Sequence, residues 1–502
     1  MVLVALFLLQ LVAYSYLFTE MTLTNHTLPN TLVSGYPSYR TSGEGRWLAD
    51  FIIFLQGGSG VQSLQMTVAA LLQAFNGVLF SRLVGLSSRW EVFLVSAILC
   101  LFPAFLDYYS FAVDHVSFVI GDSFVIAGAC AWVWGQHLRF RIMLTSGFYL
   151  LALSTYAPKI MLISVFILLS LILILTVHRA RHQADPSQGW QRLIRESLLL
   201  PLPMLLSVMV FWFSTKLLIL EPIFPRTHLN DLAQALQELS DSYRVFLTYL
   251  GSEIGGLPPG FIGWIPLLLL GFGVFALLSA SCRDRRFQLV LIVAIMLLPV
   301  AAHASKIINI YTPTHSGRFF IAYGYVLVFF LALALQRAQA RVFAVPLACL
   351  LLWFLFTFAA QQTNAAQLKT TYELSMINRI LARVEPMLGD HEDDDHPIVV
   401  IGRYPPFKVS DFVRWPSRMD APHLLSTEAF AHYRQPELLN LLLGRRLVHS
   451  PSPAERDSAI RAASGVATWP SASAVFLDGR TVVVALQHFS DDVPVTLSTG
   501  ER

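Results

Sequence analysis

Residues 160–177 read Ile-Met-Leu-Ile-Ser-Val-Phe-Ile-Leu-Leu-Ser-Leu-Ile-Leu-Ile-Leu-Thr-Val, a run without a charged side chain. A helix of about 20 such residues crosses a hydrocarbon core of about 30 Å. Lipid tolerates this structure because a helix satisfies its own backbone hydrogen bonds. The run therefore predicts a transmembrane helix.

Similar runs recur along the chain, which is 55% hydrophobic and 13% charged. A water-soluble globule of 502 residues cannot bury so much apolar surface. The sequence thus predicts an α-helical polytopic membrane protein whose membrane domain covers 1–361. Its first run lacks a basic start and a cleavage site, so we expect a span rather than a signal peptide. About eleven spans are expected, at about 2–18, 62–81, 91–106, 115–136, 142–157, 160–177, 198–220, 260–281, 287–303, 318–336 and 342–361.

Arginines mark every second connection between these runs. The arginine-rich connections contain Arg82, Arg139, Arg192, Arg285 and Arg337. By the positive-inside rule these connections are cytoplasmic, and the sparsely charged ones lie on the other side. We therefore expect a bacterial inner-membrane protein whose 19–61, 221–259 and 304–317 loops, and everything after residue 361, are periplasmic.

A change in composition after Phe358 predicts a second, soluble α/β domain at 366–502. Helical patterns occupy 368–387 and 427–445, and 397–402 is a short apolar strand. Near the end, two β-rich segments flank Asp478-Gly479, the dipeptide that a two-residue hairpin turn prefers.

Several function classes are excluded by what the sequence lacks. It has no phosphate-binding lysine loop, no dinucleotide fingerprint, no H-E-x-x-H and no C-x-x-C. The net charge of +3 is too small to indicate a nucleic-acid-binding surface. The four cysteines lie in or beside apolar runs and predict no disulfide framework. No cofactor or metal site is predicted, because the acidic run 391–396 does not converge on one ion. An enzyme with this sequence would take an activated substrate from the membrane.

A polar, glycine-rich loop at 34–50 separates the first two runs. Its guanidinium groups can bind anions, its carboxylate can act as a base, and its tyrosines can stack on sugars. A tight turn before the span at 115–136 carries two more carboxylates, which are costly near a bilayer unless they face a polar cavity. As the base we weigh Glu44 and Asp114 first and then Glu20 and Asp107; the alternative for each is pairing with a nearby cation.

Four cations lie at or near the expected outer ends of spans: Lys159, Lys216, Lys306 and Arg318. Snorkelling to the interface explains any one of them. Together, beside an acidic loop, they favour a pocket for a lipid-linked phosphate. The nearby side chains of His303, Tyr311 and His315 can hydrogen-bond a sugar or simply lie at the interface.

Short motifs in order along the chain resemble a known family. They are Gly45-Arg-Trp-Leu-Ala49, Phe102-Pro103 followed by Tyr109-Ser-Phe-Ala-Val-Asp114, Leu153-Ser-Thr-Tyr156, Trp469-Pro-Ser471 and Val482-Val-Val484. This pattern resembles the type II Gtr proteins, the bacterial and phage serotype-converting O-antigen glucosyltransferases. The resemblance implies a GT-C-like transferase that takes glucose from undecaprenyl phosphate to a lipopolysaccharide glycan. Such enzymes often carry an acidic pair soon after the first span, whereas this chain has Glu20 and then Glu44, which leaves the base open.

The sequence therefore predicts a membrane glycosyltransferase with a polyprenyl-phosphate-linked hexose donor and a lipid-linked or polysaccharide acceptor. A lipid-linked sugar flippase or transporter is one alternative; it predicts polar residues deep inside spans, of which Asp122 and Lys216 are the main examples. A glycan polymerase or ligase is the other, but the terminal domain and the Gly-Arg-Trp loop favour a transferase. The predicted substrate-binding residues are Arg40, Arg46, Tyr156, Lys159, Lys306, Tyr311, His315 and Arg318.

Overall fold

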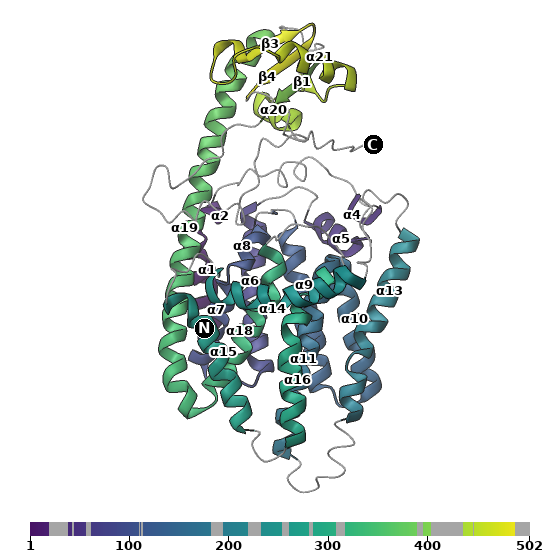
Figure 1. Ribbon diagram of the computed structural model, residues 1–502, viewed down its shortest axis with the longest axis vertical. Coiled ribbons are helices and arrows are strands. Elements are labelled where there is room, and N and C mark those ends of the chain that lie inside the picture. The colour runs from purple at the N-terminus through teal and green to yellow at the C-terminus, as the bar shows by residue number, and fades with distance from the viewer. Residues whose placement is uncertain are drawn as a thin grey trace. The chain divides into compact units, whose positions relative to one another are not determined.

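Apolar helices form most of the described chain, as the recurring runs predict. A computed structural model describes residues 1–19, 39–42, 45–56, 62–109, 111, 114–181, 194–218, 232–253, 261–280, 285–307, 317–388, 395–402, 435–444 and 446–486. These residues fall into two compact units, the first ending at Thr363 and the second beginning at Asn364. In the first unit the long helices lie side by side (Figure 1).

The helices of the first half are α1 (Val2–Ala13), α2 (Ser15–Thr19), α4 (Tyr39–Ser42), α5 (Trp47–Leu55), α6 (Gln62–Leu83), α7 (Arg89–Cys100), α8 (Ala104–Tyr109), α9 (His115–Trp134), α10 (Leu138–Thr155), η1 (Ala157–Lys159) and α11 (Ile160–Arg181). They continue with α13 (Leu202–Leu218), α14 (Leu232–Thr248), η2 (Tyr249–Glu253), α15 (Phe261–Ala280), α16 (Arg285–Ala302), α17 (Ala304–Ile307), η4 (Gly317–Phe320), α18 (Ile321–Leu335) and α19 (Ala338–Val384).

By length and composition, five helices among the described residues can cross a membrane. They are Ser63–Leu83, His115–Trp134, Ala157–Thr176, Ile194–Leu218 and Ala338–Met387, and four shorter apolar helices lie at Val2–Ala13, Gly263–Ser279, Phe287–Ala302 and Ile321–Leu335. A membrane protein with several apolar helices is therefore confirmed. The count of about eleven spans remains a prediction.

Two helices differ from their expected limits. The expected span at 91–106 is divided into α7 and α8 near Pro103, which lacks a backbone N–H and so removes one hydrogen bond that a continuous helix would make. Conversely, the last span continues without a break through the expected separate helix at 368–387, so that α19 contributes to both units. Between Pro346 and Pro386 this helix contains neither proline nor glycine.

The centre of the first unit is α18, all 15 of whose residues are buried. A helix that is apolar on every side must be surrounded by other helices or by lipid, and here α7, α11 and α15 pack against it. Gly273 on α15 permits the closest approach, because a Cβ there would collide with the backbone of Phe330. Outer helices such as α13 instead expose large apolar side chains, including Met209, Trp212 and Phe213, as expected of a surface that faces lipid.

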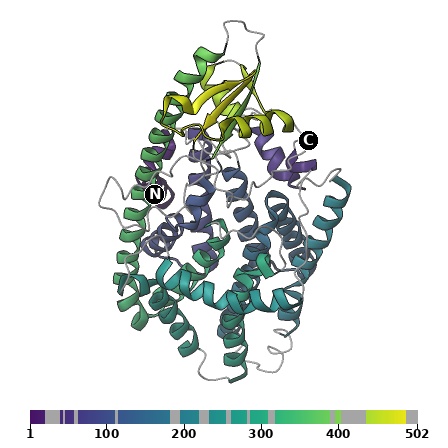
Figure 2. The same ribbon diagram turned by 45° about the horizontal axis from the view of Figure 1, so that its top comes forward.

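Helix α14 is amphipathic over Leu232–Thr248. It crosses the long helices of the first unit rather than running along them (Figures 1 and 2). The Tyr243 hydroxyl donates a hydrogen bond to the Met296 carbonyl of α16 at 2.9 Å. Helix α14 is thus fastened by its polar atoms as well as by its apolar face.

The second unit contains a four-stranded sheet with the order β2-β1-β4-β3. Its strands and remaining helices are β1 (His396–Ile401), α20 (Gln435–Leu443), β2 (Val448–His449), α21 (Pro453–Ala463), β3 (Val475–Asp478) and β4 (Thr481–Ala485). Strand β1 pairs in parallel with β2 and β4, whereas β3 and β4 form the expected antiparallel hairpin, with Gly479 at a φ of +61°. The end of α19 and α20 cover one face, and α21 covers the other. The predicted limits 366–502 and the periplasmic location remain predictions.

A buried cluster of arginines, carboxylates and aromatic rings

Two arginines meet Asp114 at the start of α9. Arg40 Nε lies 3.1 Å from Asp114 Oδ1, and Arg46 Nη2 lies 3.0 Å from the same oxygen. All three side chains are buried or nearly so, with exposed fractions of 3%, 12% and 8% for Arg40, Arg46 and Asp114. Charge-assisted hydrogen bonds in so dry an environment are strong and directional. They fix two guanidinium groups side by side.

The backbone between α4 and α5 brings the two arginines together. Gly45 has a φ of +66°, which favours glycine, and Arg46 N donates to the Arg40 carbonyl at 2.8 Å. The Thr41 hydroxyl donates to Asp50 Oδ2 at 2.7 Å and so ties α4 to α5. Helix α5 covers Trp47–Leu55, nine mostly apolar residues that are too few to cross a membrane.

Arg46 also joins the cluster to the end of α10. Its Nε donates to the Thr155 carbonyl at 3.0 Å. Its guanidinium carbon lies 5.4 Å from the ring centroids of both Phe118 and Tyr156. A guanidinium over aromatic rings gains cation–π attraction, and the rings exclude water around it.

A second set of polar side chains lies two turns further along α9. Lys159 Nζ donates to Asp122 Oδ1 and to the Tyr108 hydroxyl, and Tyr108 donates to Asp122 Oδ2 at 3.3 Å. These residues border a cavity of about 10 Å³, room for about one water molecule, which Tyr156 and Ile321 also line. Gly121 permits this packing, because a Cβ there would collide with the Thr155 hydroxyl. The set is charge-balanced and enclosed.

A third polar cluster joins α14 to the turn after α16. His303 Nε2 lies 2.9 Å from Glu238 Oε2. Burial lowers the pKa of His303, and Glu238 acts in the opposite direction. Burial also lowers the pKa of Lys306, again opposed by Glu238. The predicted phosphate ligand Lys306 therefore belongs to this third cluster.

The predicted site residues thus divide into three groups. Arg40, Arg46, Asp114 and Tyr156 come together, Lys159 lies beside them in the second set, and Lys306 lies in the third. Asp107 is buried on α8. Glu20, Glu44, Tyr311 and His315 lie outside the described residues, as does the side chain of Arg318.

Sequence reasoning missed the partners of Lys159 and Arg46. The sequence indicates Asp122 only as a polar residue inside a span, and it does not indicate Tyr108 or Phe118 as site residues. A signal was present, since Asp114, Phe118 and Asp122 are spaced i, i+4 and i+8 and therefore share one face of α9. Within the described residues, no group of three or more His, Cys, Asp or Glu side chains is arranged to hold a metal ion.

The fold and this cluster define a helical membrane protein with buried cations gathered at one end of its first unit. Residues 25–334 match the family described as glucosyl transferase GtrII. The match covers more than half of the chain, so the chain belongs to this family, which confirms the predicted resemblance. No curated protein and no solved structure matches the chain.

Proposed function

We propose that the protein transfers glucose from a polyprenyl phosphate to a glycan, such as O-antigen, at the periplasmic face of a bacterial inner membrane. Membership of the glucosyl transferase GtrII family supports the transferred sugar. The observation that carries the donor class is the paired arrangement of Arg40 and Arg46 on Asp114. Guanidinium groups bind phosphate with two hydrogen bonds, so two of them on one carboxylate suit a phosphate, and the neighbouring aromatic rings suit a lipid-linked sugar.

The proposed reaction is a direct displacement at the anomeric carbon. The acceptor hydroxyl oxygen bonds to C1 as the bond from C1 to the phosphate oxygen breaks. The hydroxyl proton passes to a carboxylate, and polyprenyl phosphate leaves with the bonding electrons. Arg40 and Arg46 stabilise the negative charge that grows on the departing phosphate, which is where fixed donors contribute most to rate.

In our proposal Asp114 positions the two arginines rather than acting as the base. It accepts hydrogen bonds from both arginines, and a proton on it would remove these charge-assisted contacts. A different carboxylate is better suited to take the acceptor proton. We propose that this base is one of Glu44, Glu20 and Asp107. Of the three, the structure describes Asp107, which is buried on the short helix α8.

The arrangement of connections supports a site on the outer side. Gln336 Nε2 donates to the Val84 carbonyl at 2.9 Å, and Arg141 Nη1 lies 3.5 Å from Glu196 Oε1. These contacts bring arginine-rich connections together at helix ends remote from Asp114. Alkaline phosphatase fused after Gln361 is expected to be active and fused at Pro186 inactive. The reverse result would put the site on the cytoplasmic side.

The donor class is tested with purified protein in lipid, given radiolabelled polyprenyl-phosphate glucose or a nucleotide-linked glucose, each with candidate glycans. Transfer from the lipid donor alone is the expected result. Transfer from the nucleotide-linked sugar alone would overturn the proposal.

The base is tested by comparing two amide substitutions. Asp107→Asn is expected to lower kcat about 10²–10⁴-fold with an unchanged donor KM, as loss of a general base does. Asp114→Asn should mainly raise the donor KM, because it releases the arginines. An Asp107→Asn variant with full activity would move the assignment to Glu44 or Glu20.

A further inference from the structure

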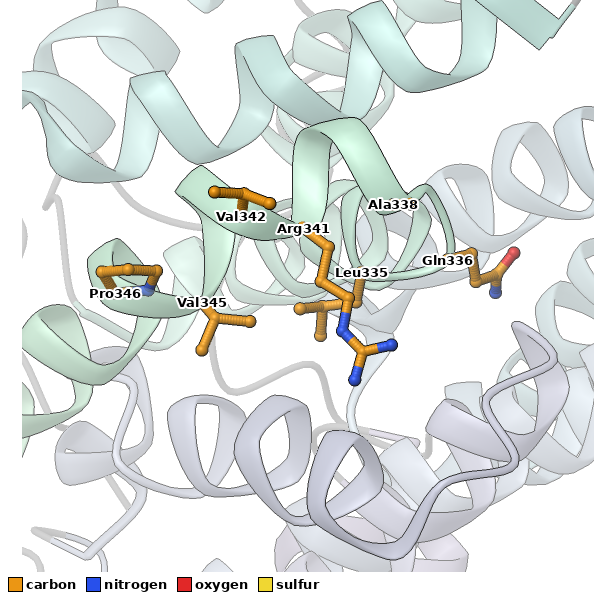
Figure 3. A pocket seen from close by; sticks show the side chains of 7 residues that line it. All are labelled: Leu335, Gln336, Ala338, Arg341, Val342, Val345 and Pro346. Atoms are coloured by element: carbon orange, nitrogen blue, oxygen red, sulfur yellow. The ribbon is translucent and has the colours of Figure 1, made fainter.

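The turn between α18 and α19 borders a groove of about 500 Å³. Leu335, Val342, Val345 and Pro346 form its apolar part, and Arg341 and Gln336 supply its polar atoms (Figure 3). Pro346 carries no backbone N–H, so the helix offers no donor to the Val342 carbonyl beside the groove. The groove therefore combines hydrocarbon with polar groups at one end.

Two contacts fix the polar part. Arg341 Nη1 lies 3.3 Å from Glu91 Oε1, and the Arg341 guanidinium carbon lies 4.8 Å from the centroid of the Trp90 ring. The Arg341 side chain is still 45% exposed, whereas that of Glu91 is 9% exposed. One side of the guanidinium is thus held by the protein, and the other remains accessible to a ligand.

The surroundings of the groove are strongly cationic. Residues 82–91 and 335–346 are joined by the bond from Gln336 to Val84 and contain four arginines and one glutamate, a formal charge of +3. Arg82, Arg89, Arg337 and Arg341 are all exposed. Tryptophan and arginine at the end of an apolar helix are typical of the depth at which lipid headgroups lie.

We propose that this groove binds an anionic phospholipid. The headgroup phosphate lies against Arg341 with Arg337 nearby, and an acyl chain lies along Val342, Val345 and Pro346. Charge complementarity selects an anionic over a zwitterionic headgroup, because basic pockets between helices at the headgroup level attract anionic lipids. The groove is separate from the proposed donor site. The 15 residues of α18 extend about 22 Å from Ile321, which lines the small cavity beside Tyr156 and Lys159, to Leu335 at the groove. The proposal therefore does not depend on the identity of the glucose donor.

Native mass spectrometry of the purified full-length protein tests this proposal with phosphatidylglycerol and phosphatidylcholine as probes. The wild-type protein is expected to retain phosphatidylglycerol preferentially. Arg341→Gln should reduce that retention about fivefold, the effect of about one arginine at a membrane surface. Val345→Trp should reduce it as well, because it fills the groove without changing any charge.

Arg244→Gln is the matched control, since the Arg244 side chain is 74% exposed on α14. It should leave lipid retention unchanged. Because Arg341 also neutralises Glu91, thermal unfolding without added lipid is measured for every variant, and Val345→Trp decides the matter if Arg341→Gln is unstable. Equal retention of the two lipids by wild type, or unchanged retention by Val345→Trp, would overturn the proposal. Displacement of phosphatidylglycerol by an equal amount of polyprenyl phosphate would also overturn it, by reassigning the groove to the donor.

Discussion

The two charged sets on one face of α9 are built differently. At the start of the helix, Arg40 and Arg46 reach Asp114 from short segments joined at Gly45. Their three formal charges, two positive and one negative, sum to +1. Two turns further on, Lys159 and Asp122 neutralise each other and share Tyr108, between helices that pack on all sides.

The difference in net charge suggests different roles for the two sets: stabilising the helix packing for the neutral one and binding a phosphate for the positive one. A balanced ion pair that is fully enclosed can hold helices in register, but it offers no net charge to a substrate. A positive set carried by short segments can both attract a phosphate and adjust to it. We therefore expect substitutions in the enclosed set to change stability most and substitutions in the cationic set to change donor use.

The largest effect is expected for Lys159→Met, which leaves Asp122 buried without its cation. Breaking a buried ion pair by removing one partner costs about 3–5 kcal/mol. Thermal unfolding of the protein in detergent measures the loss. Lys216→Met is the control, because Lys216 is an exposed lysine whose ammonium lies 5.8 Å from the Trp212 ring centroid.

The double variant Lys159→Met with Asp122→Leu tests whether the loss of stability comes from the unpaired Asp122. Replacing both members of a buried pair by apolar groups is often nearly neutral, so part of the lost stability should return. If Lys159→Met and Lys216→Met unfold at the same temperature, the enclosed set is not a structural pair.

Much of the helical scaffold could be predicted from sequence, because hydropathy and chain length are local properties. The run at 160–177 lies within α11, and the hairpin around Asp478-Gly479 is present as β3 and β4. The break at Pro103 was missed because the surrounding residues are apolar enough to read as one span. The continuous helix α19 was missed because its composition changes from apolar to polar without a helix-breaking residue.

The site was predicted less completely, because ion pairing depends on tertiary contacts. Arg40, Arg46 and Asp114 were identified from their residue types, but their meeting across 68 and 74 positions could not be inferred. Lys159 was assigned to the phosphate, since nothing in its neighbouring sequence reveals Asp122, 37 positions away. Helical spacing alone would have placed Asp122 on the same face as Asp114.

The next effect is expected for Arg46→Gln, which removes one of the paired guanidinium groups. Loss of a charge-assisted contact in a partly dry site costs about 1.5–3 kcal/mol, so transfer from the lipid donor should fall about ten- to a hundredfold. Thermal stability should change less than in Lys159→Met, because Arg40 still neutralises Asp114. Steady-state kinetics with Arg244→Gln as the control measures the difference. Equal activity of the two variants would remove Arg46 from the phosphate site.

A smaller effect is expected for Thr41→Val, which tests whether α4 positions Arg40. The substitution removes the hydroxyl that donates to Asp50 and loosens α4 from α5. Loss of about 1 kcal/mol should raise the donor KM about fivefold. Thr67→Val is the control, because its hydroxyl donates only within α6, to the Ser63 carbonyl at 2.8 Å. A donor KM that is unchanged in both variants would mean that Arg40 holds its place without α4.

The smallest effect is expected in the third cluster, where His303 is buried and its partner Glu238 is partly exposed. Burial, and then Lys306, lower the pKa of His303 below its ordinary 6.5, while Glu238 and Asp241 oppose the shift. Below about pH 6.5 the unfolded chain binds a proton here that the folded chain resists, so stability is full above this pH and falls as the pH drops toward the folded pKa. The unfolding temperature of wild type should therefore fall more between about pH 7.5 and about pH 5.5 than that of His303→Gln, with exposed His137→Gln behaving like wild type. If the unfolding temperatures of wild type and His303→Gln changed equally with pH, protonation of His303 would not control the stability of the contact between α14 and the turn after α16.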